Sequence, residues 1–461
     1  MDRVGTSGTH RMVFRQMSSH PNPLSTTRPR IVPIHRMDSP ALSRRRFVQG
    51  ASWVAGSLLA GARLRAQQPA NRVVVGVMGL HRGRAHLEGF LTVPGCDIGT
   101  VCDVDRRAAA EAADWVEKKT GRRPREVVDF RTMLDDRSID AISIAAPNHW
   151  HAPATILACD AGKHVYVEKP GSHNPREAQW MVAAARKHRR FVQMGNQRRS
   201  WTMVREVMDL LHGGILGKAH AARSWYHADR TGIGRGRPAP VPDWLDYSLW
   251  QGPAPERPYL DNVVHYNWHW RWHWGGGELA NNGPHFLDLA RWGLGVDCPI
   301  RVSCTGGRHY FRDDQETPDT IMAAFDFGSS QITWECHSCN PVAPHGAGVG
   351  VEFLGEGGSL LLVDSGWKHR DGKGRTVREG SAPRRDSDHF LNFIEAIRGN
   401  ARLNSEIAEG QKSTLLCHLG NIAWRTGQTL HLDPKTTTVR SNRDAAALWG
   451  RDYRKGWRPK V

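Results

Sequence analysis

IDAISIAAPNHWHAPATILACDAGKHVYVEKP, residues 139–170, places one helix-forming run between two short apolar runs. Residues 142–146 and 164–167 are the apolar runs, and the first is typical of a strand buried on both faces. The helix-forming run, residues 152–161, ends at Gly162. The order strand, helix, strand predicts a βαβ unit, whose loops emerge at the ligand-binding edge of a parallel sheet.

Two polar clusters follow these predicted strands and should meet at that edge. Their residues are Pro147, Asn148, His149, His151, Glu168 and Lys169. The pairing of PNHxH with GKHVxxEKP resembles the glucose-fructose oxidoreductase, inositol dehydrogenase and rhizopine catabolism (Gfo/Idh/MocA) family of nicotinamide-dependent oxidoreductases. The resemblance covers the chain from about residue 71 to the end, and it implies that Lys169 is the catalytic lysine.

A dinucleotide-binding pattern precedes this stretch. An apolar strand, residues 72–78, leads into a glycine turn at Gly79 and a helix at residues 85–91. A second strand, residues 96–102, ends at Asp103. An acid about 20 residues after the turn is typical of ribose binding. A carboxylate there repels a 2′-phosphate, so the sequence predicts NAD or NADP, with NAD favoured.

The glycine turn departs from the usual pattern, because His81 stands where a second glycine would let the backbone approach a pyrophosphate. Arg82 or Arg84 either contacts the phosphates instead or is simply solvated. The predicted cofactor contacts are Gly79, His81, Arg82, Gly83, Asp103, Pro147, Asn148, His151, Glu168 and Lys169.

Strands and helices alternate up to about Gly195, which predicts an α/β Rossmann domain with a parallel sheet over residues 67–195. Residues 196–461 contain many β-rich runs between turns, which predicts an α+β domain with a large open-faced, mostly antiparallel sheet. Helices at residues 390–398 and 405–427 are expected to pack back between the domains. In the resembled family this sheet carries the substrate site and makes oligomer contacts, so a homo-oligomer is expected.

A second diagnostic stretch is GGGELANNGPHFLD, residues 275–288, which resembles the family's GGG…D…H..D motif. Pro284 suits the first turn of a helix that starts near Gly283. The resemblance implies that His285 is the catalytic histidine. Asn281 stands where many members carry a catalytic aspartate, and it either orients the substrate or marks the helix entry, because an amide takes up no proton.

The predicted catalytic residues are Lys169, His285 and Asn281. Oxidising a secondary alcohol needs a base for the hydroxyl proton, and His285 titrates near neutrality. Lys169 is expected to have a lowered pKa and to polarise the developing carbonyl. If the family's acid is supplied from elsewhere, the candidates are Glu168, Glu278 and Asp288, although Asp288 can equally be an ion-pair partner.

NWHWRWHW, residues 267–274, carries four tryptophans at alternate positions. It is either a sugar-binding loop, since indole faces stack on sugar rings, or an aromatic strap buried at the domain interface. The predicted substrate contacts are Arg198, Trp270, Trp272 and Asp288. No metal site is predicted, because His269 and His273 lack an accompanying acid or cysteine.

The net charge of +17 is concentrated at the N-terminus, where residues 1–66 hold eleven Arg against two Asp. Residues 43–47, SRRRF, match a twin-arginine signal, with a moderately apolar run at 48–64 and Ala66 before a cleavage point. That run is too short for a stable membrane span. Export by the twin-arginine route, to the periplasm or beyond, is therefore predicted for a leader of residues 1–66.

The other compositional features are bland. The eight cysteines are interpreted as small buried hydrophobes, since twin-arginine cargo folds where thiols stay reduced. No nucleic-acid-binding pattern is present, and the remaining positive charge is interpreted as a basic surface.

The sequence as a whole predicts an exported NAD(P)-dependent oxidoreductase. It would act on a hydroxyl of a sugar, polyol or glycoside with a tightly held cofactor. One alternative is an NAD-dependent glycoside hydrolase of the same superfamily. The other is a non-catalytic NAD- or sugar-binding protein, which would need neither EKP nor His285.

Overall fold

The computed structural model describes residues 71–440 and 442–461, which belong to one compact unit, residues 65–461. The predicted leader and twin-arginine signal lie outside the described residues. No helix within the described part is both long and apolar enough to cross a membrane.

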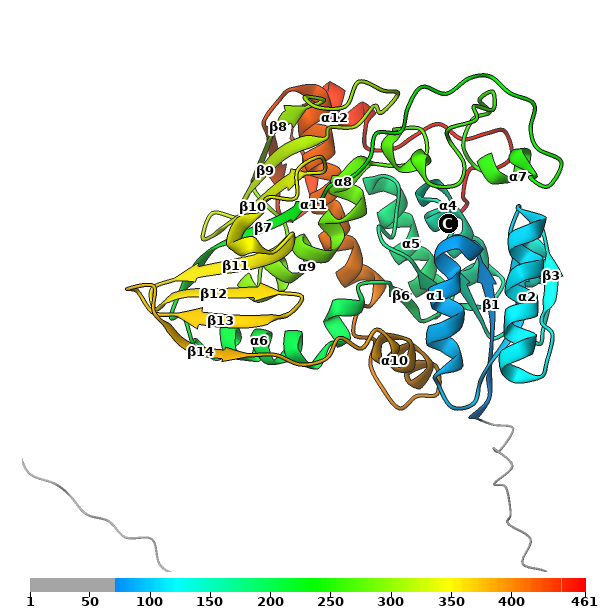
Figure 1. Cartoon of the computed structure of the whole chain (residues 1–461), viewed down its shortest axis with the longest axis horizontal. Coiled ribbons are helices and arrows are strands. Elements are labelled where there is room, and N and C mark those ends of the chain that lie inside the picture. The colour runs from blue at the N-terminus through cyan, green and yellow to red at the C-terminus, as the bar shows by residue number, and fades with distance from the viewer. Residues whose placement is uncertain (1–70, 441) are drawn as a thin grey trace, which may run out of the picture. The chain divides into compact units, whose positions relative to one another are not determined.

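The first sheet is parallel, with strand order β3-β2-β1-β4-β5-β6 (Figure 1). Its strands are β1 (Val73–Met78), β2 (Cys96–Cys102), β3 (Arg125–Val127), β4 (Ala141–Ile144), β5 (His164–Val167) and β6 (Val192–Met194). The helices between them are α1 (Leu80–Leu91), α2 (Arg106–Thr120), α3 (Arg131–Leu134), α4 (Asn148–Asp160) and α5 (Pro175–Lys187). The order reverses between β1 and β4, which is where doubly wound sheets bind ligands. The predicted Rossmann fold is therefore confirmed.

The helix α4 begins at Asn148, four residues earlier than predicted, so the polar PNHWH cluster lies in a helical turn and not in a loop. Pro153 lies inside this helix and has no N–H to donate to the carbonyl of His149, four residues before it. Arg451 Nη2 donates to that carbonyl instead, at 2.5 Å. A residue near the C-terminus thus satisfies the carbonyl that the proline leaves free.

The second sheet has the strand order β14-β13-β12-β11-β7-β10-β9-β8-β15-β16. Its strands are β7 (Ala219–His227), β8 (Arg301–Gly307), β9 (Thr320–Asp326), β10 (Gln331–His337), β11 (Val349–Gly355), β12 (Gly358–Val363), β13 (Gly366–Arg370), β14 (Thr376–Gly380), β15 (Leu430–Asp433) and β16 (Thr438–Val439). The mostly antiparallel sheet is confirmed. Within the described strands of this second sheet, β7 and β10 form the parallel pair.

Some helices of this domain pack against one face of the second sheet, and others contact the first domain (Figure 1). They are η2 (Gln197–Ser200), α6 (Thr202–His212), α7 (Tyr247–Gln251), η3 (Asn267–Trp270), α8 (Gly277–Asn281), α9 (Gly283–Leu294), η4 (Pro344–Gly346), α10 (Ser387–Ile397), α11 (Ile407–Thr426) and α12 (Arg443–Ala447). Phe390 of α10 packs 4.8 Å from the Phe90 ring of α1, and Ser172 Oγ donates to Gln411 Oε1 of α11 at 2.9 Å. The predicted packing of the late helices between the domains is confirmed.

Residues 228–275, here called the strap, join β7 to α8 and cross to the first domain. Leu245 bridges Asp105, and the Asp246 N–H donates to the Val104 carbonyl at 2.9 Å. Behind these contacts the strap has its own apolar cluster, which includes Trp250 and Trp274. The strap therefore covers the carboxyl end of β2, which lies at the ligand-binding edge of the first sheet.

Candidate active site

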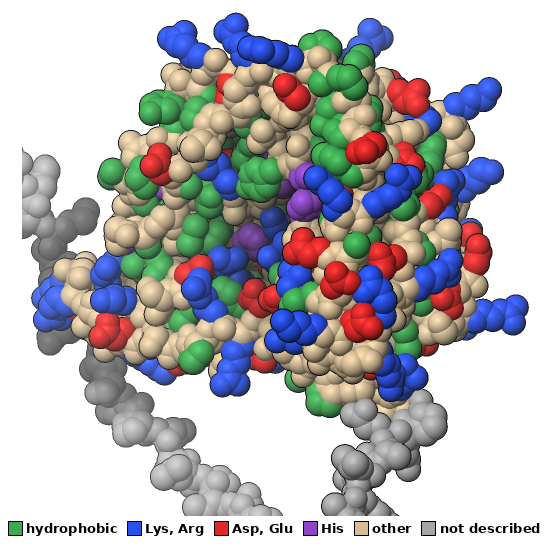
Figure 2. Space-filling model, turned by 45° about the vertical axis from the view of Figure 1, so that its right-hand side comes forward, with side chains coloured by type: hydrophobic (Ala, Val, Ile, Leu, Met, Phe, Trp, Pro, Cys, Tyr) green, Lys and Arg blue, Asp and Glu red, His purple; other side chains and the backbone are tan. Residues whose placement is uncertain are grey.

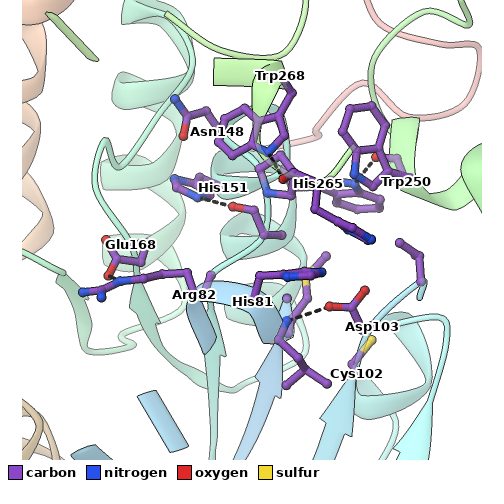
Figure 3. Close-up of a pocket in the computed structure, with 18 of the residues that line it drawn as sticks. His81, Arg82, Cys102, Asp103, Asn148, His151, Glu168, Trp250, His265 and Trp268 are labelled. Atoms are coloured by element: carbon purple, nitrogen blue, oxygen red, sulfur yellow. Dashed lines mark hydrogen bonds and ion pairs between the residues drawn. The ribbon is translucent and has the colours of Figure 1, made fainter. Parts of the chain in front are cut away.

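A cavity of about 570 Å³ opens at the carboxyl edge of the first sheet. The turn after β1 and the ends of β2, β4 and β5 form one wall, while the strap, α8 and α9 form the other. Figure 2 shows a hollow in this face with histidine side chains visible in it, and Figure 3 shows the side chains around the cavity. The predicted site residues that line it are Gly79, His81, Arg82, Asp103, Pro147, Asn148, His151, Glu168, Lys169, Asn281 and His285.

The turn between β1 and α1 depends on Gly79, whose φ is +84°. A Cβ at Gly79 would lie 2.5 Å from the backbone nitrogen of Ala146, so only glycine fits there. His81 and Arg82 follow, exposed at the N-terminus of α1, where backbone N–H groups favour a phosphate. Gly83 does not line the cavity. A Cβ there would lie 3.1 Å from Val77 Cγ1, so Gly83 instead permits close packing of helix on strand.

Asp103 lies at the end of β2 with its carboxylate fixed by the backbone. Its Oδ2 accepts from Leu80 N at 2.6 Å, and its Oδ1 accepts from Asp105 N at 2.9 Å. Burial raises the pKa of Asp103, and the two backbone donors act against that rise. The nearby arginines point elsewhere: Arg107 binds Asp105 at 2.9 Å, and Arg106 donates to the Asp243 carbonyl at 3.1 Å. In this structure neither arginine offers its guanidinium to a 2′-phosphate beside Asp103.

This arrangement predicts that the protein stripped of nucleotide binds NAD at least about tenfold more tightly than NADP, which is about 1.4 kcal/mol. The reason is that the Asp103 carboxylate accepts hydrogen bonds from ribose hydroxyls and repels a phosphate. Titration of both nucleotides by tryptophan fluorescence measures the ratio. Arg107→Gln is the matched control and should leave the preference for NAD unchanged. Equal or tighter binding of NADP would contradict this prediction. It would show that Arg106 or Arg107 reorients and binds the 2′-phosphate.

Lys169, Asn281 and His285 meet on one wall of the cavity. Lys169 Nζ donates to the Asn281 backbone carbonyl at 2.9 Å and to Asn281 Oδ1 at 3.1 Å. Burial lowers the pKa of Lys169, and Glu168 opposes the change. Burial, assisted by the positive charges of Arg198 and Lys169, lowers the pKa of His285 well below its ordinary value. His285 is therefore neutral near pH 7 and does not titrate near neutrality as predicted, because burial disfavours its charged form. Its buried Nδ1 has no hydrogen-bond partner among the described residues.

The three carboxylates considered as a replacement for the family's acid all have partners already. Glu168 Oε1 lies 2.8 Å from Arg82 Nε and 3.1 Å from His86 Nε2. Burial favours a raised pKa for Glu168, but these positive and hydrogen-bonding neighbours lower the pKa well below its ordinary value. Glu278, which burial gives a raised pKa, forms an ion pair with Arg230.

Asp288 does not line the cavity, contrary to its predicted role in substrate binding. Its carboxylate is buried and accepts from Arg199 Nε and Nη2 at 2.7 and 2.8 Å, and from Ser413 Oγ at 2.5 Å. Arg199 also lies over the Trp292 ring at 4.8 Å. Asp288 therefore holds α9 to η2 and α11.

The other predicted substrate-binding side chains also contact other residues of the protein and not the cavity. Arg198 binds both oxygens of Asp364 at 3.0 and 3.1 Å and stacks on Phe286 at 4.6 Å. Trp270 is buried beneath Arg230 at 5.1 Å, and Trp272 packs 5.9 Å from the Trp424 ring. The structure brings none of these side chains to the cavity wall.

The tryptophan run, residues 267–274, is a mainly buried aromatic segment at the end of the strap. Trp268 lines the cavity, whereas Trp274 is buried against Trp250. The two histidines between them are bound to backbone carbonyls: His269 Nδ1 donates to Tyr266 at 2.6 Å, and His273 Nε2 donates to Pro255 at 2.7 Å.

Sequence reasoning missed the cavity residues that the strap supplies. They are Leu249, Trp250, His265 and Tyr266. The His265 ring lies 4.0 Å from the His81 ring (Figure 3). The Nε2 of His265 lies 3.1 Å from Asp105 Oδ2. No motif marked these residues, and the aromatic richness of the strap was the available signal.

The remaining predicted residues, which lie in the first turn of α4, help to form the cavity. His151 places one ring nitrogen 2.7 Å from the Ala146 carbonyl and the other 2.5 Å from the Pro170 carbonyl, which ties the loop after β4 to the loop after β5. Asn148 is buried beside it. His149 lies deeper, with Nε2 donating to the Trp250 carbonyl at 2.9 Å.

Two family models match the chain, and both describe parts of one oxidoreductase family. The first, an NAD-binding Rossmann fold, matches residues 70–196, and the second, a C-terminal alpha/beta domain, matches residues 202–334. Together they span more than half of the chain. The chain belongs to the Gfo/Idh/MocA oxidoreductase family. The same two regions contain the cavity residues from both domains, including Lys169 and His285.

Curated relatives match one part of the chain. A glycosyl hydrolase family 109 protein of Saccharopolyspora erythraea is 34% identical over 152 residues, 32% of this chain and 33% of that protein. The chain matches between a third and about two-fifths of the length of the curated relatives.

Solved structures match most of the chain in fold. Levoglucosan dehydrogenase, in complex with NADH and levoglucosan, has a TM-score of 0.60 at 19% identity over 78% of this chain and 99% of that one. Aldose-aldose oxidoreductase from Caulobacter crescentus, complexed with glycerol, has a TM-score of 0.60 at 19% identity over 78% of this chain and all of that one. At such identity the likeness supports the fold alone.

Proposed function

We propose that this Gfo/Idh/MocA oxidoreductase is exported and oxidises a hydroxyl of a sugar, polyol or glycoside with a nicotinamide dinucleotide that it keeps. The observation that carries the proposal is the fixed Lys169 Nζ, bound to both oxygens of Asn281, on the same cavity wall as neutral His285. These groups lie at the carboxyl edge of the sheet, where a doubly wound fold binds its dinucleotide.

The cavity has the features that a dinucleotide requires. Gly79 leaves room for close backbone approach, the first turn of α1 offers N–H groups to a pyrophosphate, and Asp103 offers a carboxylate to a ribose. The wall at the far end carries Lys169, so the reactive ring would lie toward that end. A bound nicotinamide supplies a hydride acceptor and donor.

The residues of this chain have separable roles in such a reaction. Lys169 holds the substrate oxygen by a charge-assisted hydrogen bond and favours the partial negative charge that builds there. His285, neutral because burial lowers its pKa, accepts the hydroxyl proton. Asn281 keeps the ammonium group aimed into the cavity and takes up no proton itself. The carboxylate that many family members have at this position is therefore unnecessary for orienting the lysine.

The strap supports retention of the cofactor. It crosses the end of β2, places His265 over His81, and is held by Arg107, whose guanidinium lies 3.6 Å from the Trp244 ring centroid. Release of a dinucleotide would require these contacts to open. Twin-arginine export would carry the folded protein, with cofactor bound, to a compartment with little free NAD(P). A retained cofactor must then be recharged by a second substrate, which favours exchange between two carbohydrates. Aldose-aldose oxidoreductase, a structural relative, is named for such an exchange.

Isotope transfer tests this proposal. Dialysed protein, given a carbon-deuterated aldose or polyol panel and a second sugar carbonyl, should move deuterium into the reduced acceptor without added nucleotide. Mass spectrometry of the products measures the transfer, and protein with the Lys169→Ala substitution is the matched control. If every donor and acceptor pair transfers deuterium only when NAD(P) is supplied, the retained-cofactor mechanism is contradicted.

The second candidate is an NAD-dependent glycoside hydrolase, which the 34% identity to a family 109 glycosyl hydrolase favours. Nitrophenyl glycosides separate the two activities. A hydrolase releases nitrophenol from them continuously and without net production of reduced nucleotide, whereas the proposed oxidoreductase releases none.

A further inference from the structure

Three metal-ligand side chains lie together on the second sheet, outside the candidate active site. They are His227 at the end of β7, and Glu335 and His337 near the end of β10. The two strands lie side by side (Figure 1) and run parallel. Their register pairs His227 with His337. Glu335 and His337 are two apart on one strand and therefore point to the same face.

That face is the one turned away from the helices. The alternate residues of β10, Ile332, Trp334 and Cys336, are buried in the main core of this domain. None of the three clustered side chains lines the cavity of the candidate active site. The cluster is therefore separate from the oxidoreductase chemistry.

The distances in the cluster match those between the ligands of one ion. His227 Nε2 lies 3.4 Å from Glu335 Oε1, and His337 Nε2 lies 3.7 Å from the same oxygen. Nitrogen and oxygen ligands at about 2.0–2.1 Å from a tetrahedral zinc ion are about 3.4 Å apart. Both of these distances are within a few tenths of an ångström of that spacing, and all three ligand atoms lie within 4.8 Å of one another.

His227 is oriented as a metal-binding histidine. Its Nδ1 donates to the Val342 carbonyl at 2.6 Å, so the lone pair lies on Nε2, the atom that faces Glu335. The residue is 6% exposed, and its buried Nε2 has no hydrogen-bond partner among the described residues. A buried acceptor without a donor is costly, and a bound cation removes that cost.

We propose that His227, Glu335 and His337 bind one divalent transition-metal ion of the zinc class. Two imidazoles and one carboxylate suit zinc better than calcium or magnesium, which prefer oxygen ligands. The side chains of Glu335 and His337 are 35% and 36% exposed, so a fourth position faces solvent and can hold water. The ion would tie the ends of β7 and β10 to the loop that carries Val342.

A second cluster, His81, Asp105 and His265, has similar spacing but is less suited to bind a metal ion. Asp105 already caps α2 through the Arg107 N–H and binds the Arg107 guanidinium with both oxygens. The cluster also borders the proposed cofactor cavity. Substitution of His265 in this cluster therefore tests whether a bound ion lies there instead.

Metal titration of the full chain tests the proposal. Protein treated with a chelator and dialysed is titrated with Zn²⁺ against a chromophoric chelator, and Co²⁺ absorbance reports the geometry. Wild type should bind one ion per chain at the cluster, and Glu335→Gln and His337→Gln should each weaken binding at least about tenfold. Both residues are part-exposed, so these variants should fold, which thermal unfolding in chelator checks.

Two substitutions control for other histidines. His265→Gln removes a member of the second cluster, and His345→Gln removes a histidine that pairs with Glu352 at 3.2 Å. Both should leave the high-affinity ion in place. Absence of saturable Zn²⁺ binding in wild type overturns the proposal, and so does binding that survives His337→Gln unchanged or disappears with His265→Gln.

Discussion

Replacing Lys169 with alanine is expected to lower kcat by about 10²–10⁴-fold, the usual loss when a positioned proton-transfer or charge-stabilising group is removed. The Nζ of Lys169 is held 2.9 Å from the Asn281 carbonyl and 3.1 Å from Asn281 Oδ1, so it is already aimed before a substrate arrives. Alanine leaves these two oxygens at a cavity wall that water can reach.

The fold and the bound nucleotide should therefore survive the Lys169→Ala change. Steady-state turnover, nucleotide content and thermal unfolding of the variant measure the three properties separately. Lys187→Ala, which removes an exposed lysine of α5, is the matched control and should behave like wild type. Turnover like that of wild type in Lys169→Ala would remove this lysine from the chemistry.

Mild acid is expected to destabilise the protein strongly. Five histidines, each 5% exposed or less, have pKa values lowered chiefly by burial. They are His86, His149, His151, His389 and His418. The pKa of His389 falls to about 4, and that of His418 to about 3. In the unfolded chain each returns to a pKa of about 6.5, so unfolding takes up protons as the pH drops below that value.

The stability that these histidines contribute is thus present above about pH 6.5 and lost as the pH falls. One unit below that pKa, His389 and His418 each cost about 1.4 kcal/mol, or about 3 kcal/mol together, and the other three histidines act in the same direction. Typical domains have only about 5–15 kcal/mol in total. Urea unfolding at about pH 7.5 and about pH 5.5 should show this loss. His418→Gln should reduce proton uptake by about one, with exposed His220→Gln as the control, and equal stability at both pH values would contradict the prediction.

The fold was predictable because many of its strands are marked by a local sequence pattern. The strand β4 is buried at all four residues and reads as an uninterrupted apolar run, and the same holds for most of β1. The edge strands of the second sheet, β14 and β16, lack this signal. The strand β14 is exposed at four of its five residues, and β16 has two residues. Their pairing comes from neighbouring strands and not from their own side chains.

The site was predictable only where short motifs carry it. Lys169, Asn281 and His285 come from two local stretches, and the fold brings them together. His265 and Trp250 reach the cavity from the strap, whose path depends on contacts with Val104 and Asp105 far away in the sequence. No local pattern encodes such a path.

Asp288 shows the opposite error. Three residues after His285 on the same helix, it had the spacing of a site residue, but its position on α9 faces Arg199 and Ser413. A buried ion pair of this kind is recognisable only once η2 and α11 are placed beside α9. The His227 cluster has the same character, since β7 and β10 are neighbours only in the folded sheet.

The protein is expected to hold a nicotinamide dinucleotide between the Gly79 turn and the Lys169 wall throughout its cycle. The most direct measurement is to purify the mature protein from its export compartment, dialyse it at length, denature it, and identify what is released by absorbance and mass. Close to one NAD or NADP per chain should be released, and that nucleotide should become reduced when a donor carbohydrate is added to the native protein alone. Protein that emerges without nucleotide, and turns over only when free NAD(P) is added, would contradict it.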